Sequence, residues 1–283
     1  MSLFKRVAIV GLGLIGGSLG MALRRRRIAQ TVVGYSRTPA TMRRARACGA
    51  IDTAAATLQE AVRDAELVVL AMPVGLVASL GSIAASHMRW GAVLTDVGST
   101  KRALVERLES ALRAGPVAFV GGHPLAGSEQ RGIAAARADM FDGSVCILTR
   151  TPRTNAAALA TVKKLWTPLV KRVVVMSPER HDALLAATSH LPHLIAWSLT
   201  LSAPRGVGAV IPPSFLEMTR IAKSDPDLWD DILLSNRRDV VSAVRRFERE
   251  LGRLRVLIAR GNAAALTRRL AAAKSRREAL HDR

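Results

Sequence analysis

The stretch of sequence that decides the fold is Val7-Ala8-Ile9-Val10-Gly11-Leu12-Gly13-Leu14-Ile15-Gly16. It places a G-x-G-x-x-G pattern directly after an apolar, β-branched run and at the opening of a helix. Gly11 permits a tight turn, Gly13 lets a ligand approach the backbone, and Gly16 lets the helix pack closely on the strand. The helix N-terminus offers unpaired N–H groups to phosphates. The motif predicts a dinucleotide-binding loop that includes Leu14 and Ile15, and a glycine turn without a ligand is the alternative.

Short apolar runs alternate with helical stretches over the first half of the chain. This alternation predicts an α/β fold in which crossover helices connect the strands of a parallel sheet. Each run is almost wholly apolar, as expected for strands that helices cover on both faces. The sequence therefore predicts a Rossmann-type doubly wound sheet, completed by a helix at about 155–170. The predicted strands are 7–10, 31–35, 67–71, 92–96, 118–120, 145–148 and 172–175.

The second half, from Pro178 onward, shows long helical patterns and no convincing strand. Ser177 is placed to cap the entering helix, with Pro178 in its first position. Pro192 and later prolines interrupt the pattern, and apolar residues between 228 and 258 recur at helical spacing. A chain of 283 residues leaves room for two domains. We predict a dinucleotide-binding domain over 1–177 and an all-helical substrate and dimerisation domain over 178–283.

The end of the second predicted strand carries no acidic residue. It reads Gly34-Tyr35-Ser36-Arg37-Thr38, where an NAD-binding chain usually has Asp or Glu for the adenosine ribose. Ser36, Arg37 and Thr38 can instead hold a ribose 2′-phosphate. We therefore expect NADP to be preferred and NAD to be accepted as well. The alternative is that Arg37 stacks on adenine or points to solvent.

The composition, with 49% hydrophobic and 23% charged residues, is that of an ordinary globular protein. A net charge of +20 raises the hypothesis of nucleic-acid binding. The basic residues are scattered, however, and aromatic residues, at 4%, are too few for base-stacking platforms. We expect an arginine-rich, solvated surface and no nucleic-acid partner. The same basic field attracts an anionic substrate.

The sequence gives few signs of a special compartment. The apolar runs fall short of the ~18–20 residues that a membrane span needs. The N-terminal segment resembles a signal peptide only superficially, because it carries the glycine motif and no cleavage site follows. Cys48 and Cys146 allow at most one disulfide. His190 and His193 lack a third convergent metal ligand. We expect a cytoplasmic protein with no membrane partner and no metal.

Polar residues gather in three later segments, at the ends of predicted strands and on one helix, where doubly wound proteins place their sites, and in a fourth segment that lies in the helical domain. The segments are TDVGSTK at 95–101, GGHPLAGSE at 121–129, TSHLPH at 188–193 and MTRIAKSDPDLW at 218–229. With GLGLIGGS at 11–18, they resemble the prephenate and arogenate dehydrogenase family, in that family's order. The resemblance implies a nucleotide-binding domain joined to a helical dimerisation domain, hence a homodimer. It also implies oxidative decarboxylation of a cyclohexadienyl acid in tyrosine biosynthesis, with hydride transfer to NAD(P).

The resemblance assigns catalytic roles to His123 and Ser99. Oxidising an alcohol carbon needs a base near the hydroxyl proton, and histidine suits this because it is neutral near pH 7. His123 is the candidate base, with a purely structural histidine as the alternative. Ser99 matches the serine that orients this histidine and the nicotinamide. Alternatively, Ser99 is an N-cap for a helix beginning at Thr100.

The resemblance also implies five substrate-binding residues. Arg220 matches the arginine that grips the ring carboxylate, for which a planar guanidinium is well suited. Ser189 and His193 are four residues apart on one helical face and can reach one ligand, or they form a hydrogen-bonded buried pair. Glu129 and Trp229 match positions that help close the family's pocket.

Two rival functions are compatible with the sequence. One is another two-domain NAD(P)-dependent dehydrogenase, of the 3-hydroxyacid dehydrogenase or imine reductase type, in which GGHPLAGSE would have no role. The other is a non-catalytic dinucleotide sensor that binds nucleic acid. The sequence does not distinguish prephenate from arogenate and does not reveal inhibition by tyrosine.

Overall fold

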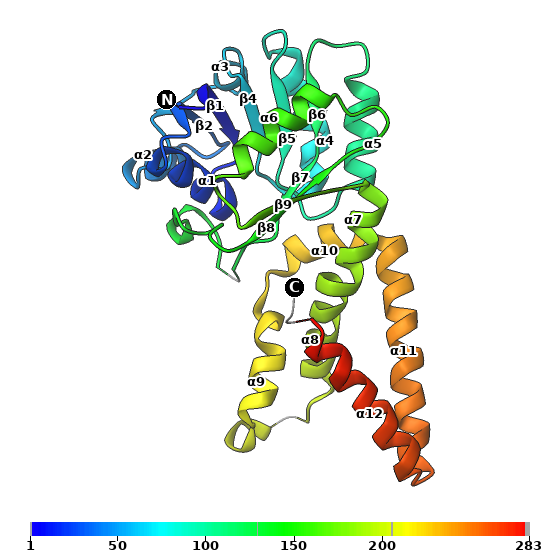
Figure 1. Ribbon diagram of the computed structural model, residues 1–283. Helices are drawn as coiled ribbons and strands as arrows, with labels where there is room; N and C mark the ends of the chain where they lie inside the picture. Colours follow the sequence, from blue (N-terminus) through cyan, green and yellow to red (C-terminus); the bar gives the residue numbers. More distant parts are fainter. Residues whose placement is uncertain (1, 129, 205, 281–283) are drawn as a thin grey trace. The chain divides into compact units, whose positions relative to one another are not determined.

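The computed structural model describes residues 2–128, 130–204 and 206–280 (Figure 1). The chain divides into two compact units, Met1–Arg237 and Arg238–Arg283. The first unit contains all the sheet strands and the helices up to α10. The second contains nearly all of α11 and α12. The predicted domain boundary between residues 177 and 178 stays a prediction.

Six strands of the first unit form a parallel sheet in the order β3-β2-β1-β4-β5-β6. This strand order is that of the Rossmann fold, so the predicted doubly wound α/β architecture is confirmed. The sequence did not predict β3, which is only two residues long with both side chains exposed. The strands are β1 (Phe4–Val10), β2 (Ala29–Tyr35), β3 (Thr53–Ala54), β4 (Leu67–Leu70), β5 (Val93–Asp96) and β6 (Ala118–Val120).

Helices cover both faces of this sheet, which explains why its strands are apolar throughout. In β1, Val7 and Ile9 belong to one hydrophobic core, and Ala8 and Val10 belong to the other. The first core includes residues of α1 (Leu14–Arg25), α2 (Pro39–Ala47) and α6 (Ala156–Trp166). The second includes residues of α3 (Leu58–Val62), α4 (Val74–Ser86) and α5 (Arg102–Ala111).

A second sheet corrects the expectation of one continuous parallel sheet. β7 (Gly122–Pro124) pairs antiparallel with β8 (Val145–Thr149), which pairs parallel with β9 (Arg172–Met176). The segments predicted at 145–148 and 172–175 are therefore strands, but of this small sheet. The lack of side chains at Gly121 and Gly122 lets the chain pack closely against both β8 and β5. A Cβ at Gly121 would lie 2.5 Å from Thr149 Oγ1, and one at Gly122 would lie 2.8 Å from the Asp96 carbonyl oxygen.

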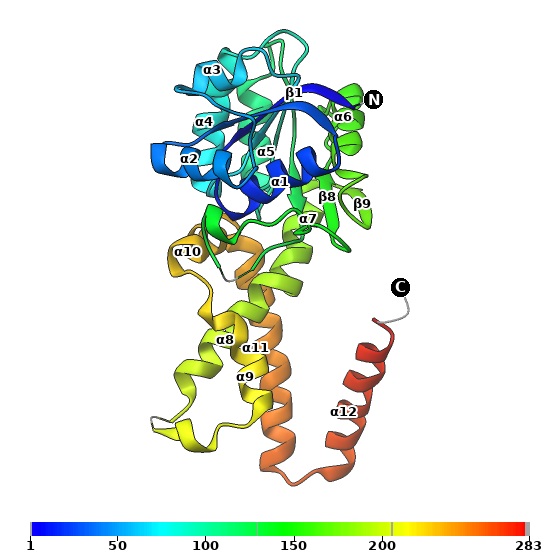
Figure 2. The same ribbon diagram turned by 90° about the vertical axis from the view of Figure 1, so that its left-hand side faces the viewer.

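The chain continues as helices after β9. The Ser177 side chain caps α7 (Pro178–Leu185) by accepting a hydrogen bond from the Arg180 N–H, as predicted. A π-helical turn, η2 (Ala186–His190), joins α7 to α8 (Leu191–Ser202), and Figure 2 shows the three as one continuous rod. The predicted break at Pro192 is wrong, because the π turn accommodates the missing proline N–H without ending the rod.

Short helices complete the first unit. They are η1 (Ile133–Ala135), η3 (Val207–Val210), α9 (Pro213–Thr219), η4 (Arg220–Lys223) and α10 (Pro226–Ser235). Two polar contacts hold α10, one against α4 and one against the loop between β5 and α5. Gly75 N–H donates to Asp231 Oδ2 over 2.9 Å, and the hydroxyls of Thr100 and Ser235 lie 2.9 Å apart.

The second unit is a pair of helices, α11 (Arg237–Ala259) and α12 (Ala263–Glu278), where α11 begins at the last residue of the first unit. Asn262 caps α12 by accepting a hydrogen bond from the Ala265 N–H. The residues described after Pro178 contain no strand, as predicted. None of the helices in the described ranges has the length and apolarity that crossing a lipid bilayer requires.

Candidate active site

The glycine loop between β1 and α1 has the geometry that its motif predicts. Gly11 has φ +100°, and a Cβ there would lie 2.2 Å from the Ala71 carbonyl oxygen. A Cβ at Gly16 would lie 1.9 Å from the Gly11 carbonyl oxygen, so neither glycine can be replaced without moving backbone. Nothing lies within 4 Å of a Cβ built on Gly13. The loop is therefore closed on the sheet side and open beside Gly13.

The N-terminus of α1 suits an anionic ligand. Gly13 is its N-cap, no side chain caps it, and its first turn contains no acidic residue. The first N–H groups of α1, which start at Leu14 and Ile15, are thus available to phosphate oxygens. These features fit the pyrophosphate of a dinucleotide.

The end of β2 lies beside this loop. Tyr35 pairs with Val10 in register, and Gly11 N–H donates to the Tyr35 carbonyl oxygen over 2.9 Å. Ser36 Oγ accepts a long, 3.5 Å hydrogen bond from the Thr38 N–H, and Arg37 is exposed. Thr38 is the N-cap of α2, where no side chain caps the helix and the first turn has no acidic residue. The segment is polar, basic and free of carboxylates.

A buried ion pair shapes the loop after β5. Asp96 and Lys101 are both 0% exposed, and the Lys101 ammonium donates to Asp96 Oδ2. The same oxygen accepts from Gly98 N–H over 2.7 Å, and Oδ1 accepts from Gly122 N–H over 3.1 Å. Asp96 therefore links the Ser99 loop to the strand that carries His123.

The N-terminus of α5 corrects one interpretation of Ser99. The helix begins at Arg102 with Lys101 as its N-cap, so Ser99 does not cap it. Instead, Asp182 of α7 accepts hydrogen bonds from Lys101 N–H and Arg102 N–H over 2.8 and 2.9 Å. Ser99 is partly buried on the loop that these contacts hold, and in the described part of the chain no hydrogen bond joins it to His123.

His123 lies in β7, paired in register with Ile147 of β8. The ring is partly buried, and its Nδ1 lies 2.8 Å from His181 Nε2. Burial holds the pKa of His123 well below its ordinary value, and the charges of His181, Lys101 and His190 add to this lowering. The ring is therefore neutral near pH 7 and can accept a proton.

His181 is a residue whose contact with the predicted base the sequence did not reveal. It is fully buried against His123, and its Nδ1 lies 2.8 Å from Asp182 Oδ1. A carboxylate directly after a histidine, on the first helix beyond the predicted domain boundary, is the signal that could have drawn attention to it.

An aromatic cluster surrounds His193 on α8. Its ring stacks on Trp229 of α10 with centroids 3.7 Å apart, and Trp197 packs edge-on against Trp229. His193 Nδ1 lies 3.0 Å from the Ser189 carbonyl oxygen, so the two residues are a hydrogen-bonded pair through the backbone, and both side chains are only partly buried. This bond places the proton on Nδ1 and leaves Nε2 as an acceptor.

Arg220 lies close to this cluster. Burial lowers the pKa of His193, the hydrogen bond to Ser189 opposes that effect, and the charge of Arg220 lowers the pKa further. Trp197 Nε1–H donates to the Ala222 carbonyl oxygen over 2.9 Å, which fastens η4, the turn that carries Arg220, to α8. The structure thus brings Arg220, His193, Ser189 and Trp229 together.

The last of the predicted substrate-binding residues, Glu129, lies outside the described residues. Near it in sequence, Arg131 forms an ion pair with Asp225, whose side chain also caps α10. Within the described ranges, no group of three His, Cys, Asp or Glu side chains is arranged to hold a metal ion, and the absence of a metal stays a prediction.

Comparison with known proteins agrees with this arrangement. A family model for the prephenate dehydrogenase nucleotide-binding domain matches residues 19–175, and one for the prephenate dehydrogenase dimerization domain matches residues 177–272. The chain belongs to the prephenate dehydrogenase family. Its nucleotide-binding domain is thus of the NAD(P)-binding kind, and family membership favours this assignment over the two rival functions.

Named relatives match nearly the whole length of the chain. The chain is 35% identical to a cyclohexadienyl dehydrogenase of Zymomonas mobilis over 92% of its own length and 90% of that protein. It is similar in structure to a prephenate dehydrogenase of A. aeolicus solved with hydroxyphenyl propionate and NAD+, with a TM-score of 0.89 and 34% identity over 98% of each chain. It also resembles a Synechocystis arogenate dehydrogenase, with a TM-score of 0.84 and 27% identity over 98% of this chain and 100% of that one.

Proposed function

We propose that this prephenate dehydrogenase family member oxidises and decarboxylates prephenate, arogenate or both, with hydride transfer to NAD(P), as a step towards tyrosine. The observation that carries the proposal is His123, a neutral histidine in a strand next to the buried Asp96–Lys101 pair, in a chain whose relatives are named for this reaction. Residues 1–177 would hold the cofactor, and residues 178–283 would bind the substrate and dimerise.

The nicotinamide, when bound, supplies the acceptor for the hydride that leaves C4 of the dienyl ring. On the protein side, Gly11, Gly13 and Gly16 with the N–H groups of α1 hold the pyrophosphate. His123 takes the proton of the C4 hydroxyl, while the ring carboxylate leaves as carbon dioxide and the ring becomes aromatic. A neutral His123 suits this step, because an imidazolium has no lone pair to accept the proton. Ser99, which forms no hydrogen bond to His123 in the described part of the chain, would orient the histidine and the nicotinamide once the cofactor is bound.

Arg220 binds the ring carboxylate, and His193 and Ser189 hold the same substrate from α8. Trp229 supports His193 through the stacked contact of their rings. Glu129, which lies outside the described residues, is retained as a predicted substrate-binding residue. The cluster geometry supports the proposal because it places two hydrogen-bonding groups and one cation on adjoining elements.

Substituting Arg220→Gln is expected to raise the substrate KM by ~10- to 100-fold, because a hydrogen bond to a charged group contributes about 1.5–3 kcal/mol. The effect on kcat should be smaller. Steady-state kinetics at saturating cofactor measures both constants, with Arg107→Gln, an exposed arginine of α5, as the matched control. An unchanged KM in the Arg220 variant would show that the carboxylate binds elsewhere.

The polar, basic end of β2 supports a preference for NADP. A charge-assisted hydrogen bond from Arg37 to the 2′-phosphate is expected to favour NADP by roughly 10-fold, after screening at an exposed position. Arg37→Ala should abolish that preference, and Ser36→Asp should reverse it through repulsion of the phosphate. The measurement is kcat/KM for each cofactor at fixed ionic strength, with Arg43→Ala, on the helix that follows this segment, as the control. A wild-type preference for NAD would refute this account of the loop.

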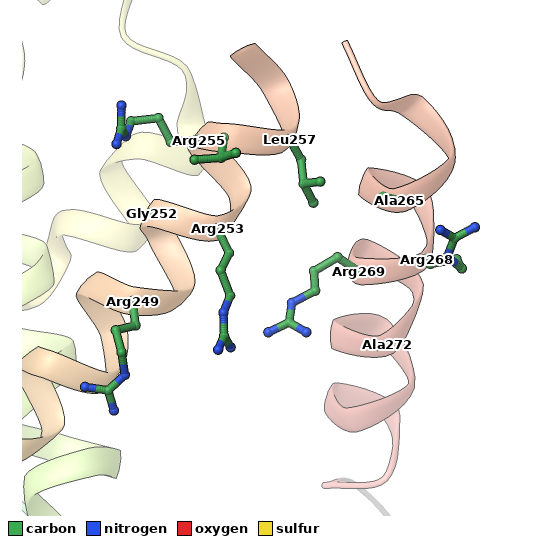
Figure 3. Close-up of a pocket in the computed structure, with 10 residues that line it drawn as sticks. Arg249, Gly252, Arg253, Arg255, Leu257, Ala265, Arg268, Arg269 and Ala272 are labelled. Carbon is green, nitrogen blue, oxygen red and sulfur yellow. The ribbon is translucent and has the colours of Figure 1, made fainter. Parts of the chain in front are cut away.

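The second unit supports a homodimer. Apolar side chains of α11 and α12 are exposed in a single chain, with Leu251 54%, Ile258 65% and Leu270 53% exposed. A groove of about 750 Å³ lies between the two helices and is lined by Val256, Leu257 and several arginines. Figure 3 shows Arg253 on one helix and Arg269 on the other along this groove. A surface of this kind is normally covered by a partner, and the family model for this region is that of a dimerization domain.

Light scattering at micromolar concentration is expected to give twice the 30.3 kDa mass of one chain. Leu251→Lys should shift the protein towards the monomer, because it places a charge on the exposed apolar face. Arg276→Glu, on the same unit but outside the groove, is the control for a change of charge. A wild-type monomer at that concentration would contradict the proposal.

Steady-state assays with prephenate and arogenate, each with NAD and NADP, test the function as a whole. The proposal expects reduced cofactor to appear with at least one of the four combinations. No reduction with any combination, in a preparation that binds cofactor, would contradict it.

A further inference from the structure

We infer that His181 and Asp182 are positioning residues that, together with His123, form a three-residue relay, and that this relay fixes which ring nitrogen of His123 accepts the substrate proton. The inference rests on the proposed function of His123 as the base. It adds two residues that lie behind the base and contact it from another element. The relay is defined as His123, His181 and Asp182.

The contacts run in one line from α7 to β7. His181 Nδ1 lies 2.8 Å from Asp182 Oδ1, and His181 Nε2 lies 2.8 Å from His123 Nδ1. Both His181 and Asp182 are buried, at 0% and 2% exposed. The two histidine rings are tilted by 58° with centroids 5.1 Å apart, so the contact between them is a hydrogen bond and not a stack.

Asp182 sets the direction of these bonds. Burial raises the pKa of Asp182, but hydrogen bonds from His181, Arg102 N–H and Lys101 N–H outweigh it, and the net pKa lies below the ordinary value. The carboxylate is therefore ionised and can only accept, so the Nδ1 proton of His181 must donate to it. Burial meanwhile lowers the pKa of His181, so its Nε2 carries a lone pair.

The tautomer of His123 follows from this direction. His181 Nε2 accepts, so His123 donates through Nδ1–H and keeps Nε2 unprotonated. Nε2 is then the atom that takes the proton from the substrate hydroxyl. The imidazolium formed on His123 donates through Nδ1–H to His181, with the negative charge of Asp182 behind it, which is the role that a carboxylate plays behind a catalytic histidine in other enzymes.

Neighbouring contacts hold the relay in place. Asp182 caps α5 through Lys101 N–H and Arg102 N–H, and its own carbonyl oxygen accepts from Asn236 Nδ2 over 2.9 Å. Asn236 also lies 3.2 Å from His190 Nδ1. Asp182 thus connects the start of α5 through its carboxylate and the end of α10 through its main-chain carbonyl to His181, and through His181 to His123.

The charged and titratable groups around the relay come from several elements. Asp96 and Lys101 form a buried pair beside it, and the Lys101 charge lowers the pKa values of both His123 and His181. Burial lowers the pKa of His190 to about 4, so that ring is also neutral near pH 7. Asp182 is therefore the negative charge that contacts His181 directly, and it acts on His123 through that ring.

The tautomers can be measured without substrate. Two-bond ¹H–¹⁵N correlation spectra of the full-length, ¹⁵N-histidine-labelled protein report which ring nitrogen of each histidine carries the proton, with His123→Asn and His181→Gln used for assignment. The relay requires neutral His123 and His181 rings that are both protonated at Nδ1. A His123 ring protonated at Nε2 would overturn it.

Kinetics then tests whether the relay matters for turnover. His181→Leu removes the acceptor and is expected to lower kcat by ~10- to 100-fold, as for carboxylates that orient metal-bound histidines, with the substrate KM and the cofactor Kd unchanged. His181→Gln supplies an amide oxygen near the position of Nε2 and should lose much less activity than His181→Leu. Asp182→Asn should lower kcat without raising KM, because the charge behind the imidazolium is lost.

The order of the two His181 variants separates positioning from packing. If His181 only filled space, the apolar Leu would be tolerated better than the buried amide of Gln, and kcat would follow that order. Equal kcat in both variants, or a higher kcat in His181→Leu, would overturn the relay. A wild-type protein with no turnover of either substrate would refute the proposed function instead, while the tautomer spectrum would still decide the geometry.

Discussion

Replacing His123 by Asn is expected to lower kcat by ~10² to 10⁴, the usual contribution of a positioned general base, while the fold and the cofactor affinity are kept. Asn is close to His in size and can still hydrogen bond to His181, but it cannot accept a proton at neutral pH. Steady-state kinetics and cofactor titration measure the two quantities. His87→Asn, at an exposed histidine that ends α4, is the matched control. Activity within threefold of wild type would remove His123 from the mechanism.

The pH dependence of the wild-type enzyme follows from the same residue. Burial, and then the charges of His181, Lys101 and His190, lower the pKa of His123 well below 6.5. Because the neutral ring is the active form, kcat/KM should stay level as the pH falls through 6.5 and should decline only at lower pH. A decline centred at or above 6.5 would contradict this assignment of the base.

The second large effect concerns stability. Lys101→Met is expected to lower the free energy of unfolding by about 3–5 kcal/mol, because it leaves the carboxylate of Asp96 buried without its counter-ion. Both side chains are 0% exposed, so water cannot replace the lost ammonium without opening the structure. Urea unfolding followed by circular dichroism gives the value. Arg89→Met, which removes an exposed partner of Glu66, should cost no more than about 1 kcal/mol.

A double variant sharpens this test. Adding Asp96→Asn to Lys101→Met removes the unpaired charge, so the double variant should be more stable than Lys101→Met alone. Two results would show that the pair does not act as described. One is a free energy of unfolding for Lys101→Met within about 1 kcal/mol of wild type, and the other is a double variant that is less stable than Lys101→Met.

The features that were predicted from sequence are those that depend on short-range patterns. The glycine loop, its strand and its helix lie within one stretch of chain, and each glycine has a steric reason that acts through near neighbours, such as Gly16 against the Gly11 carbonyl oxygen. The Ser177 cap is equally local. Local chemistry of this kind can be inferred from spacing alone.

The features that were missed depend on contacts between distant segments. An apolar run predicts a buried strand but not the sheet to which it belongs, so β8 and β9 were expected in the large parallel sheet. Ser99 precedes a helix and is a good capping residue, yet Asp182, 80 residues beyond Arg102 in the chain, occupies that role. The bond between His123 and His181 spans 58 residues, and although the adjacent carboxylate of Asp182 marks His181 locally, no local pattern shows that His181 meets His123.

The most direct test of the central claim is the stoichiometry of turnover. Reduced cofactor and released carbon dioxide would be measured together while the purified full-length protein consumes prephenate or arogenate. The account predicts one molecule of each per substrate consumed, and both signals should fall together in the His123→Asn variant. Reduced cofactor without carbon dioxide, or no turnover of either substrate, would contradict the account.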